Sequence, residues 1–316
     1  MNVKEILNQV ETFNENRNYW FTRTDAGKHF DIFYEGNYIA IGWDYLSLND
    51  IFKKSDSEIK EIIGKKEDLD PFDSVEKGKI TAIFNKISTF LKLRKGDIII
   101  VPSRNSERLA FGEIVEAEPY EDSNAIEMGN YFKRRKVKWL ELKSIFELDS
   151  IFYQLKSNQH AISRVDRFAP YIDKVIGNLF KKGDKTHYVL NVEKQDDINF
   201  RDLNKLMDNI EDIINEINKE FKFDENLDDF FVKINLQSPG KLELIKAGKS
   251  LAILAYLLNL VSCGIDPKTE KDPQIKSIAS KIQGKLNNTK TIIDTLDIDT
   301  NDLTQPFANK TKKDGK

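Results

Sequence analysis

Cysteine and histidine are both scarce in this 316-residue chain, and their scarcity excludes several kinds of site. The single cysteine, Cys263, excludes an intramolecular disulfide and a metal site built from several thiolates. The three histidines, His29, His160 and His187, lie far apart and lack the spacing of metal ligands. We therefore predict no metal site and no cofactor. A lone thiol is also typical of the reducing cytoplasm, which is the expected location.

An excess of charge of one sign is absent as well. The chain has 49 Lys and Arg residues against 52 Asp and Glu residues, which leaves a formal net charge of −3. Such a chain has no general basic field to attract nucleic acid. Any contact with nucleic acid would have to come from a local basic patch.

Long hydrophobic runs are also missing. The N-terminal residues lack the apolar core of a signal peptide, and residues 3–10 predict a short amphipathic helix instead. Residues 242–261 predict an apolar helix, but its uninterrupted apolar run is shorter than the roughly 20 residues that a membrane span needs. We interpret this segment as a core or oligomerisation helix, covered by the chain itself, a second copy or an effector partner. Membrane insertion is disfavoured.

Recognisable catalytic motifs are missing too, so the sequence predicts no catalytic residue. There is no G-x-S-x-G elbow. The stretch Ala247-Gly248-Lys249-Ser250 resembles the end of a phosphate-binding loop, but Glu243 stands where the leading glycine is needed. We interpret Gly248 as a helix-packing residue. A nuclease would place a second acid and a lysine close together on a strand that follows Asp228 and Asp229. The sequence does not have this pair there.

Tryptophan is rare, and all three tryptophans fall within one run of strand-like segments in the first half of the chain. Two stretches in this run, 48–64 and 80–91, have helical spacing instead. This alternation predicts a partly open β-barrel with helical insertions. The strand-like segments are 19–23, 38–44, 95–102, 111–115 and 134–140.

The second half predicts a small α/β and helical module, so the fold class of the whole chain is α+β. Strands are predicted at 186–192 and 230–236, and helices at 163–181, 203–221, 242–261 and 274–296. The predicted organisation is a domain over 1–165, a linker or helix over 166–185, a module over 186–300 and a mobile polar tail over 301–316.

The first half resembles a known family in the order of its landmarks. Residues 19–23 (YWFTR), 40–43 (AIGW), 95–97 (KGD), 111–114 (FGEI) and 134–139 (RRKVKW) are similar to PUA-superfamily domains. The closest form is the EVE-like domain fused to Mrr-type and other modification-dependent restriction proteins. The resemblance implies a pocket at the barrel mouth that binds a nucleobase, often a modified one. It also implies a setting in bacterial restriction or antiphage defence.

Nucleobase binding assigns roles to particular side chains. Trp20 and Trp43 are the predicted stacking residues, and Asp44 and Ser103 are predicted to bind the base edge. Four arginines are predicted to contact phosphates, which position nucleic acid without specifying its sequence. These are Arg23, Arg104, Arg134 and Arg135.

Structural interpretations compete with these roles. Trp139 alternates with Val137 in a strand, which favours a core position over the pocket. Asp97 follows Gly96 and is most simply a turn residue. The charges of residues 133–138 could form the solvated face of a strand.

Together these features predict a reader protein that binds an exposed, modified base in nucleic acid, with DNA favoured over RNA. Its C-terminal module would self-associate or recruit an effector. Two alternatives stay open. One is a diverged nuclease or NTPase, and the other is a nucleotide-sensing effector that acts on a membrane or a partner protein.

Overall fold

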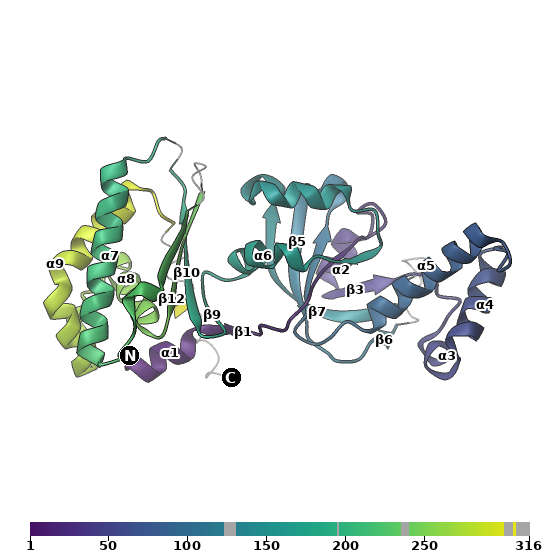
Figure 1. Ribbon diagram of the computed structural model, residues 1–316, viewed down its shortest axis with the longest axis horizontal. Helices are drawn as coiled ribbons and strands as arrows, with labels where there is room; N and C mark the ends of the chain where they lie inside the picture. Colours follow the sequence, from purple (N-terminus) through teal and green to yellow (C-terminus); the bar gives the residue numbers. More distant parts are fainter. Residues whose placement is uncertain (123–130, 195, 235–239, 300–305, 308–316) are drawn as a thin grey trace. The chain divides into compact units, whose positions relative to one another are not determined.

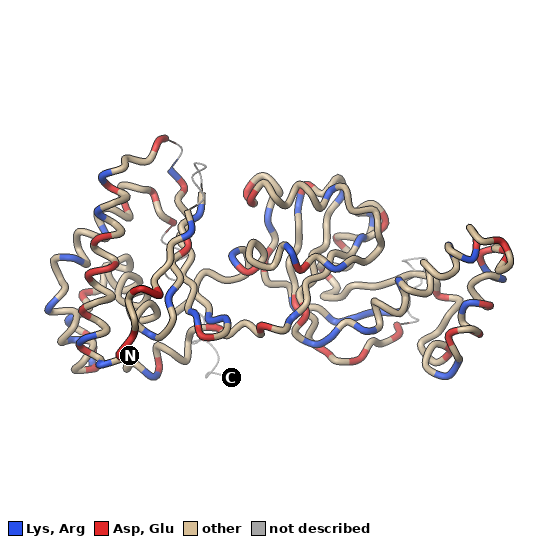
Figure 2. Tube along the Cα trace, viewed as in Figure 1, with Lys and Arg blue, Asp and Glu red and all other residues tan. Residues whose placement is uncertain are grey.

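The computed structural model describes residues 1–122, 131–194, 196–234, 240–299 and 306–307 (Figure 1). The chain divides into two compact units. The barrel unit comprises Asn16–Ile176, and the helical unit comprises Met1–Glu15 together with Gly177–Lys316. Lys and Arg residues are interspersed with Asp and Glu residues along both units (Figure 2).

The barrel unit is built on a curled seven-stranded sheet with the order β3-β7-β5-β4-β2-β8, in which β6 pairs with β7. Strands β2 and β4 are parallel, and the other pairs are antiparallel. The predicted α+β class with a partly open, barrel-like sheet is confirmed at this level. The strands are β2 (Tyr19–Thr22), β3 (Tyr38–Ile41), β4 (Ile98–Pro102), β5 (Arg108–Ile114), β6 (Tyr120–Glu121), β7 (Lys133–Ser144) and β8 (Ile162–Arg164).

Strand β4 explains why this sheet has two cores. All five of its residues are buried, so both faces of the strand are covered. Successive side chains of a strand point to opposite faces. Ile98 and Ile100 therefore pack into one apolar cluster, and Ile99 and Val101 pack into another. The second cluster lies next to the candidate site described below.

Helices interrupt the strands of the barrel unit, as the helical spacing predicts. The stretch 48–64 forms two helices instead of one, because Ser47 and Ser55 each begin a capping box. The stretch 80–91 lies in a longer helix that begins after the capping residue Asp73. The helices are α2 (Phe30–Glu35), α3 (Leu48–Lys53), α4 (Asp56–Lys66), α5 (Ser74–Leu91) and α6 (Ala169–Ile176). Short 3-10 turns occupy Arg104–Ser106, Ile145–Glu147, Ser150–Ser157 and Asp166–Phe168.

The helical unit has a five-stranded sheet with the order β1-β9-β10-β12-β11, and long helices cover one of its faces (Figure 1). Tyr188 and Leu190 of the sheet share one core with the apolar faces of these helices. The strands are β1 (Glu11–Phe13), β9 (Leu179–Lys182), β10 (Lys185–Val192), β11 (Phe230–Ile234) and β12 (Gly240–Ala247). The helices are α1 (Val3–Gln9), α7 (Phe200–Phe221), α8 (Ser250–Ser262) and α9 (Pro273–Thr295), with 3-10 turns at Leu227–Asp229 and Pro267–Thr269.

The predicted helix over 242–261 is wrong in its first third. Residues 240–247 form strand β12, which lies between β10 and β11, and the helix begins only at Ser250. Leu242 and Leu244 reach the core with a period of two, which is a strand pattern. In helix α8 every residue from Ser250 to Val261 is buried within the chain, so the apolar run forms core and leaves no open stripe for a partner. No helix in the described part of the chain is long and apolar enough to cross a membrane.

The predicted domain boundaries also need correction. Residues 1–15 belong to the helical unit, because β1 pairs in parallel with β9 and Ile6 is buried in that core. Residues 166–185 are no linker, since α6 belongs to the barrel unit and β9 to the other sheet. The predicted tail over 301–316 lies outside the described residues, apart from 306–307.

The predicted helix over 163–181 is likewise wrong at both ends. Its first residues belong to β8, which pairs with β2, and its last residues form β9. Only Ala169–Ile176 is helical, with Pro170 in the first turn, where proline is tolerated. Pairing with neighbouring strands decides the conformation of the ends.

Candidate functional site

A pocket of about 700 Å³ opens in the barrel unit where β2, β3 and the last turns of α5 meet. This volume lies within the range of small-molecule sites, which is about 300–1,000 Å³. We call it the large pocket. Its polar lining residues are Thr22, Arg23, Asp25, His29, Lys86 and Gln159, and its larger apolar or aromatic ones are Ile41, Trp43, Phe90, Tyr131 and Ile162.

Trp43 is the most unusual residue in this lining. Its backbone has φ of 60°, in the left-handed region. A bulky side chain rarely adopts this conformation, which costs on the order of 1–3 kcal/mol and persists only when the surroundings enforce it. The Trp43 indole is half-buried, and the Lys86 ammonium lies 5.8 Å from the centre of its ring.

A buried ion pair beneath Trp43 enforces this conformation. The Lys133 ammonium donates to the Trp43 carbonyl oxygen at 3.0 Å and to an Asp44 carboxylate oxygen at 2.9 Å. The two side chains are only 1% and 7% exposed. The same carboxylate also accepts hydrogen bonds from the backbone N–H groups of Tyr131 and Phe132. This cluster joins the turn after β3 to the start of β7.

Tyr131 contributes a second aromatic wall. Its ring centre lies 4.6 Å from that of His29 and 5.7 Å from that of Phe33. Burial raises the pKa of the Tyr131 hydroxyl, and the charges of Asp25 and Asp44 raise it further. The phenol therefore stays neutral at physiological pH and can donate or accept a hydrogen bond in the pocket.

The loop after β2 forms another wall and depends on a glycine. Asp25, Ala26 and Gly27 all have positive φ, and a Cβ on Gly27 would overlap the backbone of Ser103 and Arg104. Only glycine allows the two loops to approach so closely. A hydrogen bond from Lys28 lowers the pKa of the Asp25 carboxyl, and the two charges lie 2.9 Å apart.

Arg23 holds a fixed place at the end of β2. Its guanidinium donates to the backbone carbonyl oxygen of Lys156 at 2.9 Å and to that of Asn158. Arg23 lines the large pocket and also a second pocket of about 180 Å³, which we call the small pocket. Arg23 therefore lies between the two pockets, and its contact with a phosphate stays a prediction.

The structure brings some predicted base-binding residues to the pocket and places others elsewhere. Trp43 lines the large pocket, but Trp20 does not. The Trp20 ring nitrogen donates to Asp97 at 3.0 Å, and the indole packs against a core cluster. Asp97 is more than a turn residue, because it is 1% exposed and also accepts from the backbone of Asn18 and Arg94. Trp20 is therefore corrected to a structural residue.

Asp44 and Ser103 differ from their predicted roles as well. The Asp44 carboxylate is bound to Lys133 and to two backbone N–H groups, which suits a positioning residue instead of a base-edge contact. Ser103 lines the small pocket, and its hydroxyl accepts from the Arg108 backbone at 2.9 Å.

The first three basic side chains of β7, those of Lys133, Arg134 and Arg135, are buried, whereas Lys136 and Lys138 are exposed, so the solvated face expected over residues 133–138 is present only in part. Arg135 is fully buried and donates to the carbonyl oxygens of Leu91, Leu93 and Glu116. Burial lowers the pKa of its guanidinium. Arg134 is 6% exposed and pairs with Asp122. A phosphate could not reach Arg135, and Arg134 already has a carboxylate partner.

Neither Arg104 nor Trp139 lines the large pocket. Arg104 is exposed on the turn that Gly27 contacts, so it stays available to solvent. Trp139 packs on Gly112, where a Cβ would overlap its ring, and its ring centre lies 5.3 Å from that of Tyr34. Trp139 is half-buried, packs against a core cluster and lines neither pocket.

Several lining residues were missed by the sequence analysis. Lys86 and Phe90 are four positions apart on α5, so they lie on one face of the helix. The sequence shows this spacing, but it does not show that this face of α5 lies next to β3. Gln159 and Tyr131 come from loops whose position depends on the fold.

Metal and phosphate-loop chemistry find no support in the described residues. No group of three or more His, Cys, Asp or Glu side chains there could hold a metal ion.

At the start of α8 the Glu225 carboxylate accepts from the backbone of Lys249 and Ser250 and pairs with the buried Lys246. A Cβ on Gly248 would overlap this carboxylate. Gly248 therefore makes room for Glu225, which corrects its interpretation as a helix-packing residue.

Comparison with known proteins adds one finding. Residues 19–166 match a family described as a domain of unknown function (DUF8426). This stretch covers nearly all of the barrel unit, including both pockets. No curated protein and no solved structure matches the chain.

Proposed function

We propose that the barrel unit is a PUA/EVE-like reader domain that binds an exposed, modified base of nucleic acid in the large pocket. The observation that carries this proposal is the strained Trp43 at the pocket wall, fixed by the buried Lys133–Asp44 pair. Backbone strain concentrates at ligand sites, because the surrounding structure must stabilise it. The pair holds the Trp43 backbone, and an aromatic face at the wall of a pocket is the element that base stacking requires.

The rest of the lining supports a base as the ligand. Trp43 and Tyr131 provide aromatic surface, while Thr22, His29 and Gln159 provide polar atoms for a base edge. Lys86 and Arg23 add positive charge, which suits a ligand attached to phosphates. The setting in restriction or antiphage defence is part of the same proposal and rests on the resemblance of the sequence alone.

The alternatives have less support. An NTPase would need a free phosphate site at the start of α8, and Glu225 occupies that position. An effector that acts through the apolar helix would need its stripe exposed, and α8 is buried.

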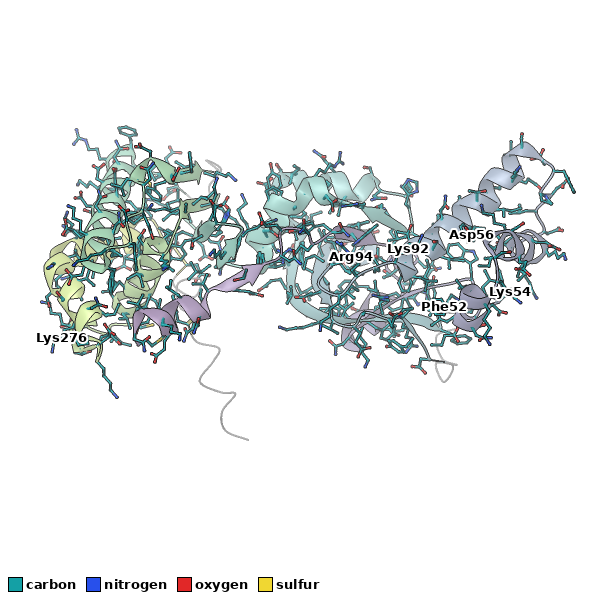
Figure 3. All side chains as sticks on the ribbon, turned by 60° about the horizontal axis from the view of Figure 1, so that its bottom comes forward. Phe52, Lys54, Asp56, Lys92, Arg94 and Lys276 are labelled. Atoms are coloured by element: carbon teal, nitrogen blue, oxygen red, sulfur yellow. The ribbon has the colours of Figure 1, made fainter. Side chains whose placement is uncertain are left out.

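Binding of oligonucleotides tests the proposal. Single strands carrying unmodified, methylated or hydroxymethylated bases are titrated against the intact chain, Trp43→Ala and Phe52→Ala. Phe52 is 63% exposed on α3 and serves as a matched aromatic control (Figure 3). Loss of one stacking contact of about 1–3 kcal/mol should weaken selective binding by about tenfold to a hundredfold in Trp43→Ala only. Equal binding by all three proteins would contradict the proposal.

A further inference from the structure

The small pocket lies directly beside the large one. The two share Arg23 and Ala26 in their linings, so the end of β2 and its loop form the boundary between them. The far side of the small pocket is the turn after β4, with Ser103, Asn105 and Ser106. A single ligand could therefore extend from one pocket into the other across Arg23.

The chemistry of the small pocket favours an anion. Arg23 and Lys156 bring two positive charges, and the described residues that line it include no carboxylate. Three hydroxyl groups (Thr24, Ser103 and Ser106) and the Asn105 amide supply polar contacts. By contrast, the large pocket contains a carboxylate, that of Asp25. Positive groups without a counterion in a confined space attract anionic ligands.

The size of the small pocket limits what it can hold. Its volume of about 180 Å³ corresponds to about six water molecules. A phosphate group is compact enough for such a space, whereas a base with its sugar needs the larger one. The two volumes therefore match the two parts of a nucleotide.

The two cations differ in mobility, which also suits phosphate binding. Two backbone carbonyl groups fix the Arg23 guanidinium, and one of them belongs to Lys156 itself. The Lys156 side chain is exposed and lies over the Tyr153 ring, with the ammonium 5.0 Å from the ring centre. Arg23 can thus orient an anion, while Lys156 can turn towards it on binding.

We propose that the small pocket is a phosphate subsite, so that the ligand of the barrel unit is a phosphorylated nucleoside unit instead of a free base. The phosphate lies between Lys156, Arg23 and the hydroxyl of Ser106, and the attached base enters the large pocket. The assignment of the base rests on the proposed function. The anion site itself rests on the small pocket alone.

Inorganic phosphate tests the anion site without any base. The intact chain, Lys156→Ala and Lys54→Ala are titrated while the Ser106 backbone amide is followed by NMR. Lys54 is a surface lysine paired with Asp50 at the end of α3 and serves as the control (Figure 3). We expect a saturable shift for the intact chain and Lys54→Ala, with about tenfold weaker binding in Lys156→Ala. No saturable shift, or equal binding in all three, would overturn the anion site.

A second titration links the subsite to the base. Nucleosides are compared with their 5′- and 3′-monophosphates, and we expect about tenfold tighter binding of one monophosphate series, lost in Lys156→Ala. Nucleoside binding without any preference for a monophosphate would leave the base pocket standing and overturn the phosphate subsite. Phosphate binding with no gain from an attached nucleoside would overturn the nucleotide assignment and the proposed function together.

Discussion

The loop after β2 and the loop before α8 use the same local device with opposite results. Each contains a glycine with positive φ, Gly27 at +89° and Gly248 at +102°, pressed against another part of its own unit. At Gly248 the neighbour is the Glu225 carboxylate, which fills the start of the helix with the chain's own anion. At Gly27 the neighbour is backbone, and the adjoining small pocket keeps its cations without a carboxylate.

This difference shows that a glycine loop with nearby cations does not by itself make an anion site. The Glu225 carboxylate binds the loop before α8 from within the chain, so this loop has a structural role. The small pocket beside the loop after β2 has no carboxylate in its lining and is therefore the better place to look for an anionic ligand.

Removal of the internal anion should have the largest effect. Glu225→Ala leaves the buried Lys246 ammonium without its carboxylate and frees two backbone donors of α8. Breaking a buried pair on one side costs about 3–5 kcal/mol. Chemical denaturation should show this loss in the unfolding of the helical unit, with Glu220→Ala, a surface pair with Lys281, as the control. Equal stability of the two variants would contradict the structural role of Glu225.

Substitution of Gly27 in the loop after β2 should have an intermediate effect on stability. Gly27→Ala adds a Cβ in a left-handed conformation and makes it overlap the backbone of Arg104. Gly96→Ala has nearly the same φ, +87°, but open space around the added atom. The left-handed conformation alone costs about 1–2 kcal/mol, so Gly96→Ala measures that cost and Gly27→Ala should lose more. If the two variants unfold at the same denaturant concentration, the close contact between the loops is not essential.

Relief of the strain at Trp43 should have the smallest effect on stability. Trp43→Gly and Trp43→Ala both remove the indole, but only glycine adopts a φ of 60° without strain. The glycine variant should therefore be more stable than the alanine variant by about 1 kcal/mol, although the pocket wall is lost in both. A more stable alanine variant would show that the backbone relaxes once the indole is gone, and that the strain depends on the side chain.

Local patterns predicted much of the secondary structure. The amphipathic spacing of 203–221 and 274–296 corresponds to α7 and α9, and the segment 186–192 corresponds to β10. The failures came where two signals overlap. Leu242 and Leu244 could continue the apolar pattern of α8 or alternate in a strand, and pairing with β10 and β11 selects the strand.

The candidate site was predictable only in part, for a similar reason. Arg23 follows β2 directly and Trp43 follows β3 after Gly42, so their place at strand ends, where the pocket opens, follows from local order. The burial of Arg135 and the pairing of Lys133 with Asp44 depend on residues about 90 positions apart, or on carbonyl groups of a distant helix end. A basic run looks the same in a sequence whether its charges are solvated or buried.

The α+β composition and the long helices can be predicted from the amino-acid sequence, and the single cysteine excludes a multi-cysteine site, because these features depend on residue counts and on contacts within a few positions. Which aromatic residue lines the pocket and which arginines are buried became known from the three-dimensional fold. The fold also shows that the Glu225 carboxylate occupies the loop before α8, while the loop after β2 adjoins an open pocket. Burial and ion pairing depend on atoms that the fold brings together from distant parts of the chain. A local sequence pattern does not show which residues these are.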